Sequence, residues 1–249
     1  MANYFSFNGV SSSSFGLQIQ SKRIFDAPLL EQTLQPVPGR DGDLLLKGSR
    51  LGNVIVSYTC FFKENSITNL ASQIRRIKAW LYSSKNQYAI LTDAYDPAYF
   101  RYALLREAVT IDEQLNKLGI FTVTFTCLPY KYSIDGQTEL TAANKTLTVA
   151  NPESFEALPV IKVTGSGAFT LTVSGTGSAC TVTLANTGST SRQIIFDSSR
   201  MLVYADAALL TSLCTFSSGF PVLKPGSNTV RVTGSGVTAL SVIPGWRTL

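Results

Sequence analysis

The chain has 249 residues, which accommodates one or two domains, and only 15% of them are charged against 45% hydrophobic, with a formal net charge of +5. This low charge fraction argues against an intrinsically disordered chain and suits a protein that hides surface in an assembly. No apolar run is long enough to cross a bilayer, and the opening residues lack a basic segment followed by an apolar one, so we expect no membrane span and no secretory signal.

Strands and tight turns dominate the first half of the sequence. Residues 37–42, Val-Pro-Gly-Arg-Asp-Gly, predict a tight turn between two strands, because two glycines supply positive φ and Asp tolerates it. Residues 53–62 and 120–128 are rich in β-branched and aromatic side chains, which favours half-buried strands.

One helix is predicted between those two strands, over residues 66–83, with Ser66 as its N-cap. Its apolar residues share one face, as expected for a helix packed on a core: Ile67, Leu70, Ala71, Ile74, Ile77 and Leu81. Lys78 falls inside this face. Either its aliphatic stem runs over the core and carries the charge to water, or the face contacts a neighbouring subunit.

Residues 88–92 predict a further strand, and Asp93 to Pro97 a turn. Residues 99–111 and 121–127 are expected to be partner strands, which makes this half a sheet with a helix laid over it. After Tyr132 the charge thins and Thr, Ser and Gly dominate. Alternating segments such as Phe169, Leu171 and Val173 predict a β-sandwich or jelly roll. We therefore predict a mainly β chain with domains at 1–133 and 134–249.

The sequence contains no histidine, which removes the commonest general base and the commonest transition-metal ligand. The four cysteines form no C-x-x-C pair, so we expect free thiols and no zinc site. No phosphate-binding or dinucleotide-binding glycine motif is present. We expect no cofactor, no metal and no catalytic residue.

Three local carboxylate pairs remain, and turn chemistry accounts for each: Asp41 with Asp43, Asp93 with Asp96, and Asp112 with Glu113. A glycosidase, the enzymatic alternative, needs two carboxylates that face each other across a sugar, so we predict that the chain is not an enzyme. A calcium site at Asp93 and Asp96 is a second alternative. The only basic cluster, Arg75, Arg76 and Lys78, is interpreted as a solvated or subunit-contacting helix face, and not as a nucleic-acid reader.

Several motifs occur in a characteristic order along the whole chain: FSFNGVSSSSFGLQI (5–19), VPGRDG (37–42), FTCLPYKY (125–132), FPVLKPGSNTV (220–230) and the closing Trp246-Arg247. In this order and spacing the chain resembles the distal tail (Dit) proteins of long-tailed bacteriophages, the siphoviruses. The resemblance implies an N-terminal β-rich domain with one α-helix that closes into a hexameric ring. It also implies a C-terminal galectin-like or carbohydrate-module-like β-sandwich.

The same resemblance implies a structural hub of the baseplate. One face of the ring would join the tail tube protein, the other would join the tail-associated protein (central fibre or lysin), and DNA would leave through the channel without specific binding. The chain would reside at the tail tip of the virion, and in the host cytoplasm during assembly. Because Lys or Arg in the channel would bind phosphate, we expect the excess positive charge, including Arg75, Arg76 and Lys78, to lie away from the channel.

The candidate subunit-interface residues are Pro38, Gly39, Arg40, Asp41, Gly42 and Lys78. For the Pro38–Gly42 stretch, a turn alone and a turn that also contacts the next subunit both fit. The alternative function is a glycan-binding adhesin module of the tail tip that acts through the sandwich. Such sandwiches usually present aromatic platforms, and here Trp246 and Tyr204 are among few candidates.

Overall fold

The computed structural model describes residues 3–46, 50–114, 117–185 and 188–249. The chain is mainly β, as predicted, and it divides into two compact units, residues 1–131 with 249, and residues 132–248. Each unit has its own hydrophobic core. In the described part of the chain no helix is long and apolar enough to cross a membrane.

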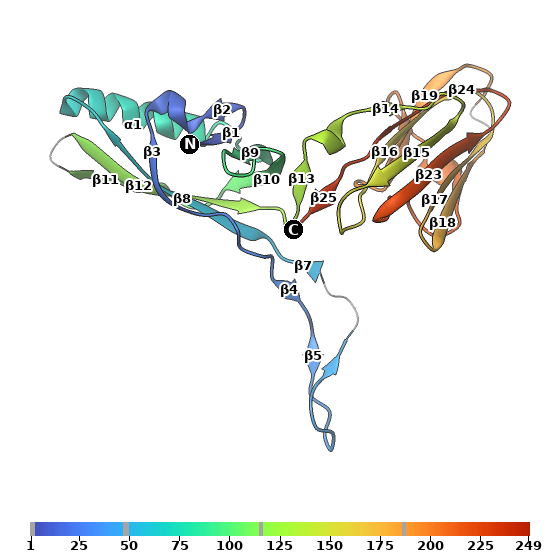
Figure 1. Ribbon diagram of the computed structural model, residues 1–249, viewed down its shortest axis with the longest axis horizontal. Helices are drawn as coiled ribbons and strands as arrows, with labels where there is room; N and C mark the ends of the chain where they lie inside the picture. The colour runs from blue at the N-terminus through green and yellow to red at the C-terminus, as the bar shows by residue number, and fades with distance from the viewer. Residues whose placement is uncertain (1–2, 47–49, 115–116, 186–187) are drawn as a thin grey trace. The chain divides into compact units, whose positions relative to one another are not determined.

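The first unit is built on an antiparallel sheet with the strand order β2-β1-β9-β10-β12-β8-β3, and β11 pairs with the start of β12 (Figure 1). Its strands are β1 (Phe5–Phe7), β2 (Val10–Ser11), β3 (Gln18–Arg23), β8 (Val54–Lys63), β9 (Ala89–Asp93), β10 (Tyr99–Leu105), β11 (Ile111–Gln114) and β12 (Leu118–Cys127). The long strands β8 and β12, both predicted, pair in unbroken register from Lys63 with Leu118 to Val54 with Cys127. The predicted strand over 99–111 is two strands, β10 and β11, which pair with different ends of β12.

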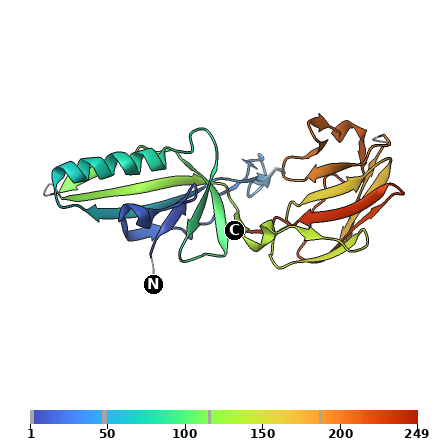
Figure 2. The same ribbon diagram turned by 90° about the horizontal axis from the view of Figure 1, so that it is seen from above.

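Helix α1 (Ile67–Leu81) covers one face of this sheet and runs along strands β8 and β12 (Figure 2). Ser66 is its N-cap, as predicted, and the Ser66 hydroxyl accepts a hydrogen bond from the backbone N–H of Asn69. A short 3-10 helix, η1 (Ser12–Phe15), lies beside it. On β8 alternate residues face the helix and are buried, which is the period of two that the sequence predicts.

The buried face of α1 is rotated from the predicted one. Trp80 and Gln73 are buried, whereas Ile67 is half exposed. The Trp80 indole N–H donates to the Phe7 carbonyl at 3.0 Å, and the Gln73 amide donates to the Phe15 carbonyl at 2.7 Å. These hydrogen bonds fix the rotation, and Lys78 is exposed to solvent as a result.

The second unit is a β-sandwich, which confirms the predicted fold class. Its sheets have the orders β14-β24-β16-β19-β20-β21 and β15-β23-β17-β18-β22. The strands of these sheets are β14 (Leu140–Thr141), β15 (Thr146–Asn151), β16 (Val160–Gly165), β17 (Phe169–Gly175), β18 (Ser178–Leu184), β19 (Arg192–Asp197), β20 (Leu202–Ala205), β21 (Ala208–Leu209), β22 (Cys214–Phe216), β23 (Gly226–Thr233) and β24 (Val237–Ile243), with 3-10 turns η2 (Asp135–Gln137) and η3 (Thr211–Leu213). Two further strands, β13 (Lys131–Ser133) and β25 (Arg247–Thr248), pair with each other outside these two sheets. Phe169 and Phe196, from different sheets, meet edge to face in the core with ring centroids 6.1 Å apart.

All four cysteines are free thiols. Burial raises the pKa of Cys60 and of Cys127 to about 12, and the pKa of Cys214 to about 11. These thiols therefore stay protonated near neutral pH, so they serve as small apolar core residues.

Replacing Trp80 by Phe is expected to lower the free energy of unfolding by about 1–3 kcal/mol, because the Phe7 carbonyl loses its buried donor while most of the ring packing stays. Chemical denaturation of Trp80→Phe measures this loss. Tyr82→Phe, at the exposed end of the same helix, is the matched control and should be close to neutral. Equal losses in the two variants would contradict this account of the helix rotation.

Candidate functional site

A hairpin arm leaves the first unit between β3 and β8 (Figure 1). We call residues 25–52 the arm. Two short strand pairs hold it together, β4 (Leu30–Glu31) with β7 (Arg50–Leu51), and β5 (Leu34–Gln35) with β6 (Leu44–Leu45). An exposed ion pair between Glu31 and Arg50 joins the first two strands, and it lowers the pKa of the Glu31 carboxyl mainly by hydrogen bonding.

The arm exposes large apolar side chains that contact no core. Phe25 is 75% exposed, Leu29 71% and Leu34 56%. The other exposed apolar residues of the arm are Leu30, Val37, Leu44, Leu45 and Leu46. Exposed apolar residues at this density mark an interaction surface, since an isolated soluble protein scatters them singly.

The predicted turn is the tip of this arm. Gly39 and Gly42 both have φ of +78°, and the Arg40 N–H donates to the Val37 carbonyl at 3.2 Å. The tip brings together the interface candidates Pro38, Gly39, Arg40, Asp41 and Gly42, all of them exposed. The remaining candidate, Lys78, lies on α1 in the body of the unit and is not part of the tip.

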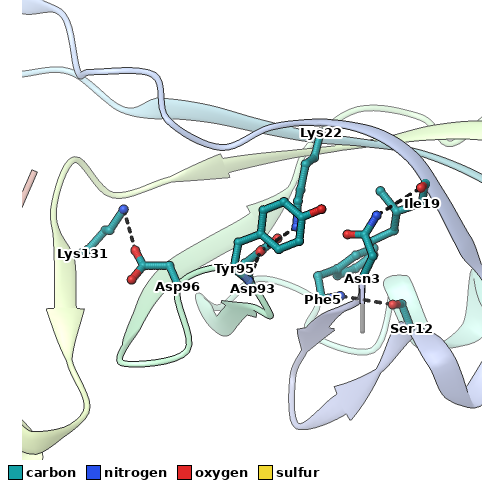
Figure 3. A network of polar contacts seen from close by, with 9 residues as sticks. All are labelled: Asn3, Phe5, Ser12, Ile19, Lys22, Asp93, Tyr95, Asp96 and Lys131. Atoms are coloured by element: carbon teal, nitrogen blue, oxygen red, sulfur yellow. Dashed lines mark hydrogen bonds and ion pairs between the residues drawn. The ribbon is translucent and has the colours of Figure 1, made fainter. Parts of the chain in front are cut away.

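A buried ion pair fastens the root of the arm to the sheet. Lys22, on the strand that leads into the arm, contacts Asp93 with 2.8 Å between Nζ and Oδ1, and their side chains are only 8% and 9% exposed (Figure 3). The Lys22 ammonium also lies 3.1 Å from the centre of the Tyr95 ring. The Tyr95 backbone N–H donates to the same Asp93 oxygen at 2.7 Å. We call Lys22, Asp93 and Tyr95 the arm clamp.

A second ion pair starts from the same turn. Lys131 contacts Asp96 at 2.7 Å, as Figure 3 shows. The predicted turn after β9 is present, because the Asp96 N–H donates to the Asp93 carbonyl at 3.1 Å, and each of the two aspartates is paired with a lysine. Among the described residues no group of three or more potential metal ligands is present, so the calcium alternative gains no support.

The clamp borders a small cavity of about 30 Å³, which Ile24, Tyr58, Asp93 and Arg101 help to line. Burial raises the pKa of Tyr58, with Asp93 adding to the effect, and burial lowers the pKa of Arg101. Asp93 Oδ2 is buried and has no hydrogen-bond partner in the described structure. A cavity of this size has room for a water molecule, which would satisfy that oxygen.

The face of the sheet opposite α1 carries mostly uncharged side chains along its two long strands, with exposed Lys63 at the end of β8 and Arg23 of the edge strand β3, which pairs with Ser57, as charged residues on the same face. We call this the open sheet face: Ile55, Ser57, Thr59 and Phe61 of β8 with Ile120, Thr122 and Thr124 of β12. All of these residues are partly or fully exposed. Ser57 pairs with Thr124 and Thr59 with Thr122, and the latter hydroxyls lie 3.3 Å apart.

Comparison with known proteins agrees with this architecture. The sequence model of the phage tail protein RIFT-related domain (Sipho_tail) matches residues 10–127. The crystal structure of the Dit protein (gp 19.1) of phage SPP1, described as a paradigm of the hub adsorption apparatus in phages that infect Gram-positive bacteria, superposes with a TM-score of 0.75 at 15% identity over 100% of both chains. Residues 10–127 therefore match the phage tail family, and the whole chain has the fold of a distal tail protein.

Two structures of the phage p2 baseplate in its activated conformation share this fold more distantly. The strontium form matches with a TM-score of 0.52 at 8% identity, over 97% of this chain and 98% of the p2 chain. The calcium form matches with 0.51 at 9%, over 97% of each chain. No curated protein sequence matches the chain. The predicted resemblance to distal tail proteins is thus confirmed.

We predict that Asp93→Asn lowers the free energy of unfolding by about 3–5 kcal/mol, because it leaves the Lys22 charge buried without a counterion. Denaturant titration measures this loss, and limited proteolysis should cut the arm faster. Asp26→Asn, which breaks the exposed Arg23–Asp26 pair beside the arm root, should cost about 1 kcal/mol or less.

A double variant separates charge from packing. Lys22→Met with Asp93→Asn removes both charges, so it should be more stable than Asp93→Asn alone. With the single variant Lys22→Met added, the loss in the double variant minus the sum of the two single losses gives the coupling between the two groups. If the decreases in unfolding free energy of the two single variants add up to the decrease in the double variant, Lys22 and Asp93 do not act as an ion pair.

Proposed function

We propose that this tail protein forms a hexameric ring that acts as the distal tail adaptor, with the tail tube protein on one face and the tail-associated protein on the other. The family match and the shared fold with the SPP1 hub protein support this role. It is a structural role, without catalysis, at the tail tip of the virion. Assembly takes place in the host cytoplasm.

The exposed arm is the observation that carries the proposal. Each fully buried leucine contributes about 1.5–3 kcal/mol, so the apolar side chains of the arm can drive association. In this proposal the arm of one subunit contacts a different part of the next subunit, so the contact is heterologous. Such contacts close into a ring when the rotation between neighbours allows it. In this proposal the tip, Pro38 to Gly42, reaches the next subunit, which is the turn-plus-contact alternative.

We place the open sheet face toward the channel of the ring. A wall that lets DNA pass must not hold phosphate, and the central side chains of this face offer hydroxyl and apolar groups without charge, whereas Lys63 and Arg23 lie at its margins. The basic residues Arg75, Arg76 and Lys78 belong to α1, which covers the opposite face of the sheet. They then lie away from the DNA path.

Ring formation is tested by mass photometry and negative-stain microscopy of the purified protein, in which we expect sixfold particles. Leu34→Glu with Leu45→Glu should shift the particles to monomers, because two charges would have to be buried at the contact. Met201→Glu with Leu209→Glu changes equally exposed residues of the second unit and should leave rings intact. Monomers at every concentration, or rings that survive the arm variant, would overturn the proposal.

The channel assignment predicts that Thr59→Lys with Thr122→Lys makes rings retain double-stranded DNA, with binding that weakens steeply as salt rises. A gel-shift titration at two salt concentrations measures the effect. Thr68→Lys with Ser72→Lys places the same charges on the exposed side of α1 and is the control. Equal DNA binding by both variants would show that the open sheet face does not line the channel.

A further inference from the structure

The first unit has a second pocket at the C-terminal end of α1, with a volume of about 250 Å³. The last residues of the helix, the turn that follows it and the end of β10 line this pocket. Leu81, Tyr82, Leu104 and Leu105 supply apolar surface, and Lys85 lies among them. We call it the α1 pocket. Apolar walls of this kind gain free energy when an apolar side chain of a partner displaces the water in them.

Positive charge surrounds the α1 pocket. Residues 66–92, which include the helix and the turn after it, contain four basic residues and no Asp or Glu. Lys78 lies one helical turn before Tyr82, whose backbone N–H donates to the Lys78 carbonyl at 3.0 Å. The side chains of Lys78 and Lys85 are both exposed. Residues 106–107, which follow the pocket on the β10 side, are an Arg and a Glu whose charges cancel. The rim of the pocket therefore favours an acidic partner.

The arm carries the complementary pattern next to its tip. Asp41 and Asp43 flank the last glycine of the turn, and three exposed leucines follow them: Leu44, Leu45 and Leu46. Pairing of β6 with β5 places Leu45 opposite Leu34. Successive residues of a strand point to opposite faces, so each face of the arm offers a leucine. On the arm two carboxylates precede an apolar segment, just as two ammonium groups flank the apolar α1 pocket.

The arm of the same subunit does not fill the α1 pocket. In Figure 1 the arm extends away from the sheet and from α1, and its tip residues are exposed. The arm that reaches each pocket must then come from a second copy of the chain. Each subunit gives one arm and receives another, which is the arrangement that a closed ring requires.

We propose that the α1 pocket is the site that receives the arm of the next subunit. This inference rests on the proposed ring and names the two surfaces of its contact. Leucines of residues 44–46 enter the pocket, and Asp41 and Asp43 approach Lys78 and Lys85 at its rim. Burial of the leucines drives the contact, whereas the charges set its register and orientation. Lys78 and the arm tip, which are predicted interface residues on separate elements, then form the two sides of one contact.

A charge swap tests this pairing. Lys78→Glu with Lys85→Glu places negative charges opposite Asp41 and Asp43. The protein concentration at which half of the chains are in rings should then rise by about tenfold or more, because two attractive contacts become repulsive. Adding Asp41→Lys and Asp43→Lys to the same chain makes the contacts attractive again and should restore assembly.

Lys145→Glu with Arg231→Glu makes the same change in net charge on the second unit and is the matched control. It should assemble as the native chain does. Mass photometry over a concentration series compares the variants. Unchanged assembly after charge reversal at Lys78 and Lys85, or a swap that does not restore assembly, would overturn the proposal.

Cross-linking locates the contact within intact rings. Asp43→Cys with Lys85→Cys should give covalent multimers under mild oxidation, since the native cysteines are buried or half-buried. Asp43→Cys with Thr68→Cys, at the other end of α1, is the control and should give few. Rings that cross-link through neither pair, or only through the control pair, would reject the α1 pocket while the ring stands.

Maleimide labelling of assembled Lys85→Cys rings asks whether the pocket is filled. We expect the thiol to be protected in the ring and to react in the monomer. A thiol that reacts freely in the ring would leave the pocket open for a different tail component, and it would contradict the proposal. Monomers at every concentration would overturn the ring and the docking site together.

Discussion

The arm depends on a charge pair that is buried where the chain leaves the sheet. A hairpin held by two short strand pairs is only marginally stable in water, so its direction must be set at the root. Lys22 and Ile24 both turn inward from the strand that enters the arm, one to Asp93 and the other into the core. Because a buried lysine needs its counterion, the strand has one favourable position on the sheet.

The buried Lys22–Asp93 pair also bears on the proposed assembly of subunits, because it fixes the root of the arm. A rigid root lets an arm with exposed leucines meet a neighbour with little loss of conformational entropy. In the proposed ring the sheet would also keep the basic helix away from the DNA. Its covered face carries α1, and the centre of its open face carries neutral hydroxyls such as Thr59 and Thr122. Side chains without charge would not hold the phosphates of passing DNA.

Local sequence patterns predicted much of the fold. The features they did not predict, the rotation of α1 and the arm clamp, depend on contacts between residues far apart in the sequence. The period of two predicted β8 and β12, and the period of 3.6 with Ser66 as a cap predicted α1 within two residues at either end. The rotation of α1 follows from the bond between Trp80 and Phe7, which are 73 residues apart. Lys22 and Asp93 are 71 residues apart, and no periodicity connects them. The tip residues were predictable because a turn depends only on neighbouring residues. The clamp could not be predicted without knowing the order of the strands in the sheet, which brings Lys22 and Asp93 together.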